Sequence, residues 1–395
     1  MTIPTRPVLA LAMAMALGTA DAHAQGTLSD VVAFLMTNQA IPTEDFERDR
    51  EAAEAARDTI ARALLVNLTS VPIATSSGGF LYRLNPELGT VQRASESFGA
   101  FFTERALTPG RGRASFGVSA TTSEFNRLNG HDLRDGSLLT IANTFRDEPA
   151  PFDTESLTLN LRTSTMTLLG SVGVTDRLEI GGAVPFVRLT LDGQRVNVYR
   201  GTPLVQASAS GTASGIADVA VRAKYTLMSG PGGGLAAAAE VRLPTGDETN
   251  LLGAGSTSWR VMGVGSVDQG RVGLHGNAGM VRGGISNEFT FAGALSLAVQ
   301  PRVTISAEFF GRHVSELRDL ILVAEPHPTI VDPPVDTLRL SAGPSGTTLL
   351  TALTGIKWNV TGTLVLGGHI AWPMAERGLT PAITPTVALE YAFPR

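Results

Sequence analysis

The sequence contains no cysteine, and this absence excludes several kinds of chemistry. Without thiols the chain can form no disulfide, no cysteine–zinc site, no iron–sulfur cluster and no thiol nucleophile. Charged residues make up only 17% of the 395 residues, below the roughly 25% that is typical of soluble domains. The net charge of −5 gives no indication of nucleic-acid binding. Aromatic residues are also few, at 6%.

No apolar run after the N-terminus is long enough for a membrane-spanning helix. The N-terminus itself carries Arg6, the apolar run 8–18 and an A-x-A site at 22–24, which predict a signal peptide over residues 1–24. A competing cleavage register lies at 20–22. The run is too short to span a membrane, since a spanning helix needs about 20 residues. We therefore expect an exported chain that is periplasmic, secreted, or inserted in the outer membrane as a barrel.

From about residue 112 onward, the chain repeats runs of roughly ten residues in which apolar and small or polar side chains alternate. In the last run, Val387, Leu389, Tyr391 and Phe393 alternate with smaller or polar residues. A period of two places each set on one face of a strand. Long strands with one apolar face are typical of transmembrane β-barrels.

The runs predict twelve strands, within a margin of two. Their approximate bounds are 112–125, 154–174, 178–191, 215–228, 234–244, 257–267, 271–282, 288–299, 302–313, 346–358, 362–372 and 384–393. Residues 137–147 are a candidate extra strand, and the run 154–174 is long enough to contain a break. Short turns and longer connectors, such as 192–214 and 314–345, alternate along the chain, as in bacterial barrels with short periplasmic turns and long outer loops.

The charged residues decide between a β-sandwich and a barrel, because both would show alternation. An Arg or Lys on the lipid face at midplane costs roughly 2–4 kcal/mol. In these runs the charges oppose the apolar set, so we expect one face to be apolar throughout and the other to line a polar lumen. The candidate lumen-lining residues are Glu179, Asp218, Arg222, Lys224, Glu240, Arg242, Arg260, His275, Glu308, Lys357, His369 and Glu390. They are either a selectivity lining or a charge network that holds the barrel together.

Aromatic residues near the strand ends agree with a membrane barrel. Trp259 and Trp372 fall at the loop-side ends of their strands, and Tyr225, Trp358 and Tyr391 fall at the turn-side ends. Such positions are expected of two interfacial girdles.

Residues 25–111 form a separate N-terminal segment. Ser29 is a candidate cap for a helix that ends near Met36, and Thr43 is a candidate cap for a second helix over 44–67. A Gly/Ser-rich connector follows, with a hairpin-like piece at 80–91. We expect the helices to pack at the periplasmic mouth or in the lumen. The predicted fold is all-β: an antiparallel up-and-down transmembrane barrel over 112–395, preceded by this short helical extension.

Three segments resemble a known family. They are 173–185 (GVTDRLEIGGAVP), 215–225 (GIADVAVRAKY) and 240–247 (EVRLPTGD). They are similar to the hallmark strands of the MetA-pathway phenol degradation family of outer-membrane β-barrel transporters. The resemblance implies an outer-membrane location in a Gram-negative-type bacterium and a role in the uptake of aromatic or other hydrophobic compounds.

A search for catalytic or metal-binding patterns gives little. The nearest Ser/His/acid cluster is His313, Ser315 and Glu316, which more simply belongs to a barrel rim. No Gly-x-Ser-x-Gly elbow, phosphate-binding loop or calcium-loop spacing is present. We therefore expect no catalytic residues, no metal, no cofactor and no enzymatic activity.

The leading functional hypothesis is a channel or transporter for small, hydrophobic or aromatic solutes, which acts by facilitated diffusion. The alternatives are a structural or adhesive barrel whose outer loops bind a partner and, third, a lipid-acting barrel enzyme. The expected partners are outer-membrane lipid, the solute, and the barrel-assembly machinery during biogenesis, with no nucleic acid. The sequence leaves the solute, the openness of the lumen and the oligomeric state undetermined.

Overall fold

A computed structural model describes residues 26–36, 44–69, 82–85, 90–93, 95–230 and 232–393. The predicted signal peptide and the predicted helix cap Thr43 lie outside these ranges.

Twelve antiparallel strands form a closed barrel, because β18 pairs with β3 as well as with its other neighbour. In order around the barrel, the strands are β3 (Ala114–Leu128), β6 (Asp153–Gly173), β7 (Leu178–Tyr199), β9 (Val219–Gly230), β10 (Gly233–Leu243), β11 (Ser258–Gln269), β12 (Val272–Gly283), β13 (Glu288–Gln300), β14 (Val303–Val331), β15 (Pro334–Asn359), β16 (Leu364–Pro373) and β18 (Thr384–Ala392). The predicted up-and-down barrel is therefore confirmed.

Several shorter elements accompany the barrel. β8 (Thr202–Ile216) and β9 both pair with β7, so they act as one long strand that is interrupted at 217–218. The others are the hairpin of β1 (Tyr82–Asn85) and β2 (Thr90–Arg93), and the strands β4 (His131–Asp132), β5 (Leu139–Phe145) and β17 (Leu379–Pro381). β5 is the candidate extra strand, and it pairs with β6 and β15 outside the ring of twelve.

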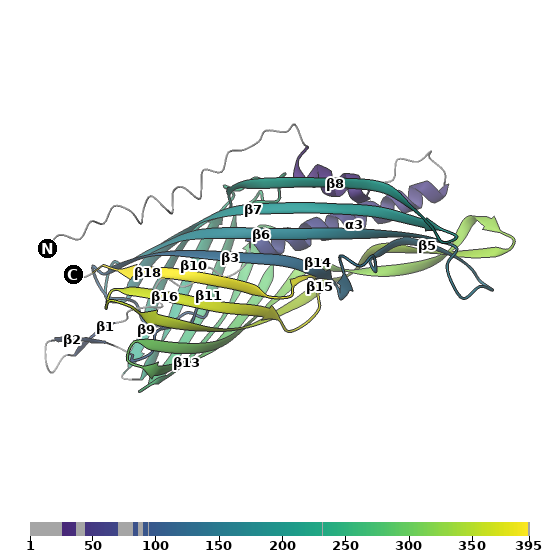
Figure 1. Cartoon of the computed structure of the whole chain (residues 1–395). Helices are drawn as coiled ribbons and strands as arrows, with labels where there is room; N and C mark the ends of the chain where they lie inside the picture. The colour runs from purple at the N-terminus through teal and green to yellow at the C-terminus, as the bar shows by residue number, and fades with distance from the viewer. Residues whose placement is uncertain are drawn as a thin grey trace.

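Two predicted loops are wrong. Residues 192–214 continue β7 and form most of β8, and residues 314–345 extend β14 and β15 into a long hairpin. β6 runs without the suspected break. The barrel therefore has a turn end with short connections and a loop end where some strands rise well beyond the others, as Figure 1 shows for the hairpin of β14 and β15.

The outer face of the barrel carries a broad apolar band. Its members are exposed large side chains such as Val221, Val261, Leu295 and Ile356. The predicted girdle residues share this face: for example, Trp259 is 49% exposed and Trp358 is 48% exposed. A band of this extent is unusual on a soluble protein and matches the lipid-facing surface of a membrane barrel.

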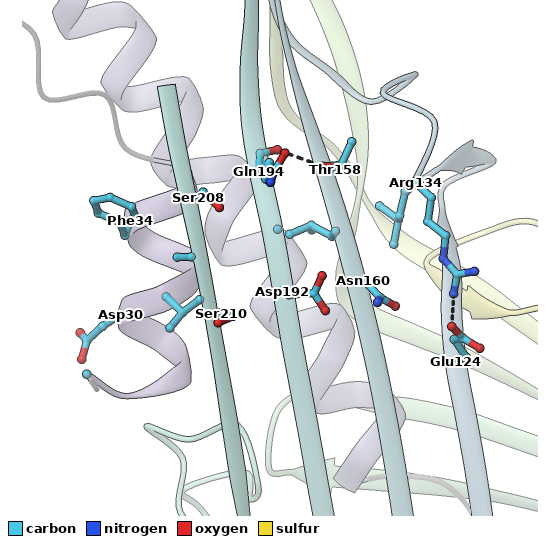
Figure 2. Close-up of a pocket in the computed structure, with 16 residues that line it drawn as sticks. Asp30, Phe34, Glu124, Arg134, Thr158, Asn160, Asp192, Gln194, Ser208 and Ser210 are labelled. Atoms are coloured by element: carbon cyan, nitrogen blue, oxygen red, sulfur yellow. Dashed lines mark hydrogen bonds and ion pairs between the residues drawn. The ribbon is translucent and has the colours of Figure 1, made fainter. Parts of the chain in front are cut away.

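The prediction that one strand face is apolar throughout is wrong for β6 and β7. The pair Met166–Phe186 is the last apolar pair on their outer face, and the next outward pair is Ser164–Arg188. Beyond it the outer face is polar, and Figure 2 shows Thr158, Asn160, Asp192, Gln194, Ser208 and Ser210 on β6, β7 and β8. These residues form two neighbouring rows across the three strands, Thr158–Gln194–Ser208 and Asn160–Asp192–Ser210. Because both rows are polar, we infer that this part of the wall lies outside the hydrocarbon layer.

The inner face of β6 and β7 changes in the opposite sense, because it becomes apolar where their outer face becomes polar. At the loop end, Leu157, Leu159, Leu161, Leu189 and Leu191 point inward and are buried. They form a hydrophobic core with the two helices, α2 (Leu28–Met36) and α3 (Glu44–Thr69). α3 lies along the inner side of the raised strands (Figure 1). The sequence suggested the periplasmic mouth or the lumen for the helices. In the structure both helices pack at the loop end, on the inner side of the raised strands.

α2 is capped two residues earlier than predicted and approaches β8 closely at Gly211. The Asp30 N–H donates to Thr27 Oγ1 at 3.3 Å, and the Thr27 N–H donates to Asp30 Oδ2 at 2.8 Å, so Thr27 rather than Ser29 is the cap. A Cβ at Gly211 would lie 2.7 Å from Leu28 Cδ2, so a glycine is needed for this close approach.

α3 buries an apolar stripe and is tied to the wall by polar contacts. Ala56, Ile60 and Leu64 are almost fully buried. Asp49 pairs with Arg339 at 2.6 Å, and Asn67 Nδ2 donates to the Leu379 carbonyl at 3.1 Å. Among the described helices, neither combines the length and the low polarity required to cross a bilayer.

We expect Leu35→Ala to loosen α2 by about 2–5 kcal/mol, because Leu35 is fully buried in the loop-end core. Amide hydrogen exchange of residues 28–36 should accelerate accordingly. Phe34→Ala is the matched control, since Phe34 is 46% exposed on the same helix. Equal exchange rates in the two variants would contradict the assignment of this core.

We expect Leu295→Arg to destabilise the barrel by about 2–4 kcal/mol, because the side chain lies mid-strand on the lipid face. Gln194→Arg should change the free energy of unfolding little, since Gln194 lies on the polar outer face at the loop end. Urea titration in lipid vesicles measures both values. A similar cost at the two positions would contradict the placement of the membrane boundary.

Candidate functional site

The structure brings the sequence-predicted lumen residues to the inner face of the barrel. All twelve are buried except Glu390, which is half-buried. Several of them contact a segment outside the predicted set: residues 95–108, which fold into the lumen and are here called the plug loop.

The plug loop begins and ends at the turn end. Ser95 Oγ donates to Asp268 in the β11–β12 hairpin at 2.9 Å, and Thr108 Oγ1 donates to the carbonyl of Asp176 in the β6–β7 turn at 2.8 Å. Between these anchors, Phe98 and Phe101 are buried. The loop therefore enters the barrel, turns near Phe101, and returns before β3 starts.

Glu308 binds the apex of the plug loop through its carboxylate. The backbone N–H groups of Phe102 and Thr103 donate to Oε2 at 3.0 and 2.9 Å, and the Phe101 N–H donates to Oε1. Lys357 Nζ donates to the Ala100 carbonyl at 2.7 Å. Charge-assisted bonds of this kind are stronger than bonds between neutral groups.

The Phe101 ring fits against the wall because two facing residues are glycines. A Cβ at Gly355 would lie 2.5 Å from the ring, and one at Gly367 would lie 3.0 Å from it. Lys357 Nζ lies 4.6 Å from the centre of the same ring. The apex of the plug loop is thus held by shape as well as by charge.

Glu104 of the plug loop completes a buried charge cluster on β7 and β9. Its carboxylate lies 2.7 Å from Arg222 and 3.8 Å from Lys224, and Lys224 also pairs with Glu179 at 3.0 Å. The cluster therefore contains two cations and two carboxylates. Removing one member of such a cluster leaves an uncompensated buried charge, which is strongly unfavourable.

Arg105 ties the returning arm of the plug loop to the β11–β12 hairpin. Its guanidinium lies 3.3 Å from Asp268 and donates to the Ser97 carbonyl at 2.9 Å. Next to it, the Ala106 N–H donates to Ser266 Oγ at 2.9 Å, and that oxygen lies 3.2 Å from His275 Nδ1.

Other predicted lumen residues contact wall groups. Glu240 pairs with Arg242 at 2.9 Å and with Arg260 at 3.7 Å. Asp218 accepts the N–H groups of Gly246 and Ala254, and so fixes the β10–β11 loop. The lumen charges thus divide into a set that binds the plug loop and a set that braces the wall.

Sequence reasoning missed Glu104, Arg105, Asp268, Glu288 and Arg312. Arg312 pairs with Glu288 at 2.8 Å in the lumen. Arg312 shares the strand parity of Glu308, so the alternation test could have found it. Glu104 and Arg105 precede the first strand of the barrel and carry no periodic signal.

A cavity of about 240 Å³ lies between Asn67 of α3 and the plug-loop residues Phe101 and Phe102. One side is a wall of hydroxyl groups from β3, β6 and β18: Ser119, Thr121, Ser123, Thr163, Thr165, Thr167, Thr384 and Thr386. The cavity also reaches Leu350 and Trp372, which have outward-facing parity on β15 and β16.

The candidate Ser/His/acid cluster does not assemble among the described residues. His313 Nδ1 lies 3.0 Å from Thr348 Oγ1. The Glu316 carboxylate accepts hydrogen bonds from Ser286 Oγ and from the N–H and side-chain amide of Asn287. These contacts are those expected of polar residues at the rim.

Comparison with known proteins shows distant likeness in fold. No curated protein matches the chain. An outer membrane channel from Pseudomonas putida F1 is 14% identical, with 73% of this chain and 98% of that chain covered and a TM-score of 0.44. The transport unit of the autotransporter AIDA-I from Escherichia coli is 12% identical, covering 71% and 90%, with a TM-score of 0.39. A Pseudomonas aeruginosa FadL homologue is 10% identical, covering 82% and 98%, with a TM-score of 0.34.

The sequence match to a family is more specific. The family described as "Putative MetA-pathway of phenol degradation" matches residues 135–316. That range contains the segments 173–185, 215–225 and 240–247 that carry the resemblance in the sequence. Residues 135–316 are thus similar to the MetA-pathway phenol degradation family, and this range runs from just before β5 into β14 of the barrel.

Proposed function

We propose that the protein is an outer-membrane channel or transporter for small, hydrophobic or aromatic solutes, which cross by facilitated diffusion without catalysis. The observation that carries the proposal is the plug loop: a closed membrane barrel holds its own residues 95–108 in the lumen and leaves a cavity above them. A lumen closed by a segment that ion pairs and hydrogen bonds hold in place, with a cavity beside it, supports a path that opens when this segment moves.

The asymmetry of the connections supports the orientation. Short turns join the strands at one end and long extensions rise at the other, which matches periplasmic turns and outer loops. The plug loop would then close the periplasmic side, and the helices would close the outer side.

The two closures favour a side route for solutes. The loop end is filled by a hydrophobic core around α2 and α3, and the turn end by the plug loop. The cavity between them touches Leu350 and Trp372 of the outward-facing set near the loop end of β15 and β16. This position favours exchange of apolar molecules with the membrane at that wall, and passage to the other side when the plug loop moves.

We expect Glu104→Gln to raise solute permeation through the barrel by about tenfold or more. The change leaves Arg222 and Lys224 with Glu179 as their remaining acidic neighbour in the cluster, and breaking a buried ion pair costs about 3–5 kcal/mol. Proteoliposome swelling and single-channel conductance measure the effect.

Glu124→Gln is the matched control, because Glu124 pairs with Arg134 and Arg162 on the exposed outer face, far from the lumen (Figure 2). If Glu104→Gln behaves as the wild type, the plug loop is not the gate. If neither protein passes any solute while both remain folded, the channel function is wrong.

A second candidate function is binding of a partner at the outer end. The hairpin of β14 and β15 projects beyond the other strands, and Val331 at its tip is 74% exposed. Replacing residues 327–334 with a short Gly/Ser turn keeps the pairing of Pro326 with Asp336.

Under the channel proposal, this shortened variant should retain wild-type permeation in proteoliposomes. Loss of adhesion to cells or surfaces, with permeation intact, would favour the partner-binding function. Loss of permeation in a folded variant would contradict the assignment of the conduction path to the cavity and the plug loop.

A further inference from the structure

The outer face of β6, β7 and β8 changes from apolar to cationic at the membrane boundary. Rows of paired residues cross the three strands, and three of these rows, in order toward the loop end, are Met166–Phe186–Ile216, Ser164–Arg188–Ser214 and Arg162–Thr190–Thr212. The first row is apolar, and each of the next two carries an arginine among hydroxyl groups. Neighbouring rows are roughly 7 Å apart along the strands. Both arginines therefore lie just beyond the lipid-facing band.

Positive charge is in excess around these two rows. Arg188 is exposed and forms no ion pair or side-chain hydrogen bond within the described part of the chain. Arg162 shares the carboxylate of Glu124 with Arg134, at distances of 3.1 and 2.5 Å. Three cations thus face one carboxylate, on a protein whose net charge is −5. A local field of this sign attracts anions.

A groove continues this face toward the loop end. It has a volume of about 830 Å³, borders Glu124 and Arg134, and reaches Asp30 and Phe34 of α2 (Figure 2). Most of its polar lining comes from hydroxyl, amide and carboxylate side chains of the three strands: Thr158, Asn160, Asp192, Gln194, Ser208 and Ser210. Together these groups both donate and accept hydrogen bonds. The groove is therefore suited to a ligand with many hydroxyl groups, such as a sugar.

The order of the three layers fits one class of lipid. Acyl chains match the apolar band, phosphate groups match the arginines, and sugars match the groove, in this order away from the membrane. Arginine binds phosphate through two parallel N–H groups. A phospholipid without sugars would leave the groove empty, and a soluble polysaccharide would leave the apolar band unused.

We propose that this face of the barrel binds a phosphorylated glycolipid of the outer leaflet, with Arg188 and Arg162 at its phosphate groups and the groove around its sugars. The site lies on the outer wall and not in the lumen, so it does not depend on solute passage. It rests on the orientation proposed above, in which the loop end lies outside the cell.

The test measures lipid binding to the full-length mature protein in detergent micelles by native mass spectrometry. The probes are bisphosphorylated lipid A, the same lipid with both phosphates removed, and lipid A extended by its first core sugars. The wild type should bind bisphosphorylated lipid A at least about tenfold more tightly than the dephosphorylated form, as expected of a charge-assisted hydrogen bond. The form with core sugars should bind more tightly still.

Arg188→Gln should lower the affinity for bisphosphorylated lipid A about tenfold and leave binding of the dephosphorylated form unchanged. Arg302→Gln is the matched control, because Arg302 is an exposed arginine in the β13–β14 turn at the opposite end of the barrel. The double variant Asn160→Ala with Gln194→Ala should lose the gain from core sugars and keep the preference for phosphate, because both residues line the groove.

Equal wild-type affinities for the two forms of lipid A would overturn the proposal, as would an equal loss in Arg188→Gln and Arg302→Gln. Binding of phosphatidylglycerol as tight as that of lipid A would indicate a general surface for anions and would overturn it too. Core sugars that add no affinity would remove the groove from the site and with it the assignment to a glycolipid. Circular dichroism verifies that each variant is folded.

Permeation separates this inference from the proposed function. Proteoliposomes of phosphatidylcholine contain no glycolipid, so solute passage in them tests the channel alone. If glycolipid binding follows the expected pattern and no solute crosses, the channel function fails and the lipid site stands. If solutes cross and lipid A shows no preference that depends on Arg188, the inference fails and the channel function stands.

Discussion

The closure of β18 onto β3 is the constraint on which the rest of the structure depends. In hydrocarbon there is no water to satisfy the free N–H and C=O groups of a strand edge, so a spanning sheet must close on itself. Closing twelve strands gives a lumen between that of an eight-stranded barrel, which side chains fill, and that of a sixteen-stranded open pore. The space must be hydrated or occupied, and residues 95–108 and the end of α3 occupy much of it.

The polarity of the barrel's inner face depends on whether its outer face meets lipid or water. Where the outer face meets lipid, the alternate positions of each strand are free to be polar, and the plug loop is bound by carboxylates and cations such as Glu308 and Arg222. Where the strands rise into water, Leu159 and Leu191 turn inward instead and need an apolar cover. α2 and α3 supply that cover, so the helices and the raised strands depend on each other.

Much of the barrel could be predicted from the sequence, because a period of two is a local property. The twelve strands and the inward parity of residues such as Lys224 and Glu240 follow from alternation and the cost of charge in lipid. The reversal near residues 163–166 was also present in the sequence, as a change in which alternate positions are apolar. If one strand face is expected to be apolar throughout, a segment in which the apolar positions change face is predicted to be a loop. This is why residues 192–214 were predicted as a loop although they belong to β7 and β8.

The plug loop could not be predicted, because its contacts are not periodic. Phe101 fits two glycines, Gly355 and Gly367, that are distant in sequence, and Glu104 meets cations on β9. Only the closed barrel brings these groups together. Residues 98–102 are apolar in the sequence, but nothing local to them shows that their partners are Lys357 and the carboxylate of Glu308 on the inner wall.

The helix pair α2 and α3 and the plug loop differ in which residues they would expose to water if they moved. Withdrawing α2 and α3 would expose the leucines of the loop end to water, and every Å² of apolar surface would oppose the movement. Withdrawing the plug loop would expose Glu308, Arg222 and Lys357, which water solvates well, while pairs such as Arg312–Glu288 could persist in the wall. Under the proposed channel function, the turn end is therefore the closure whose opening would create a hydrated lumen, and the loop end is the one that would keep the cavity covered.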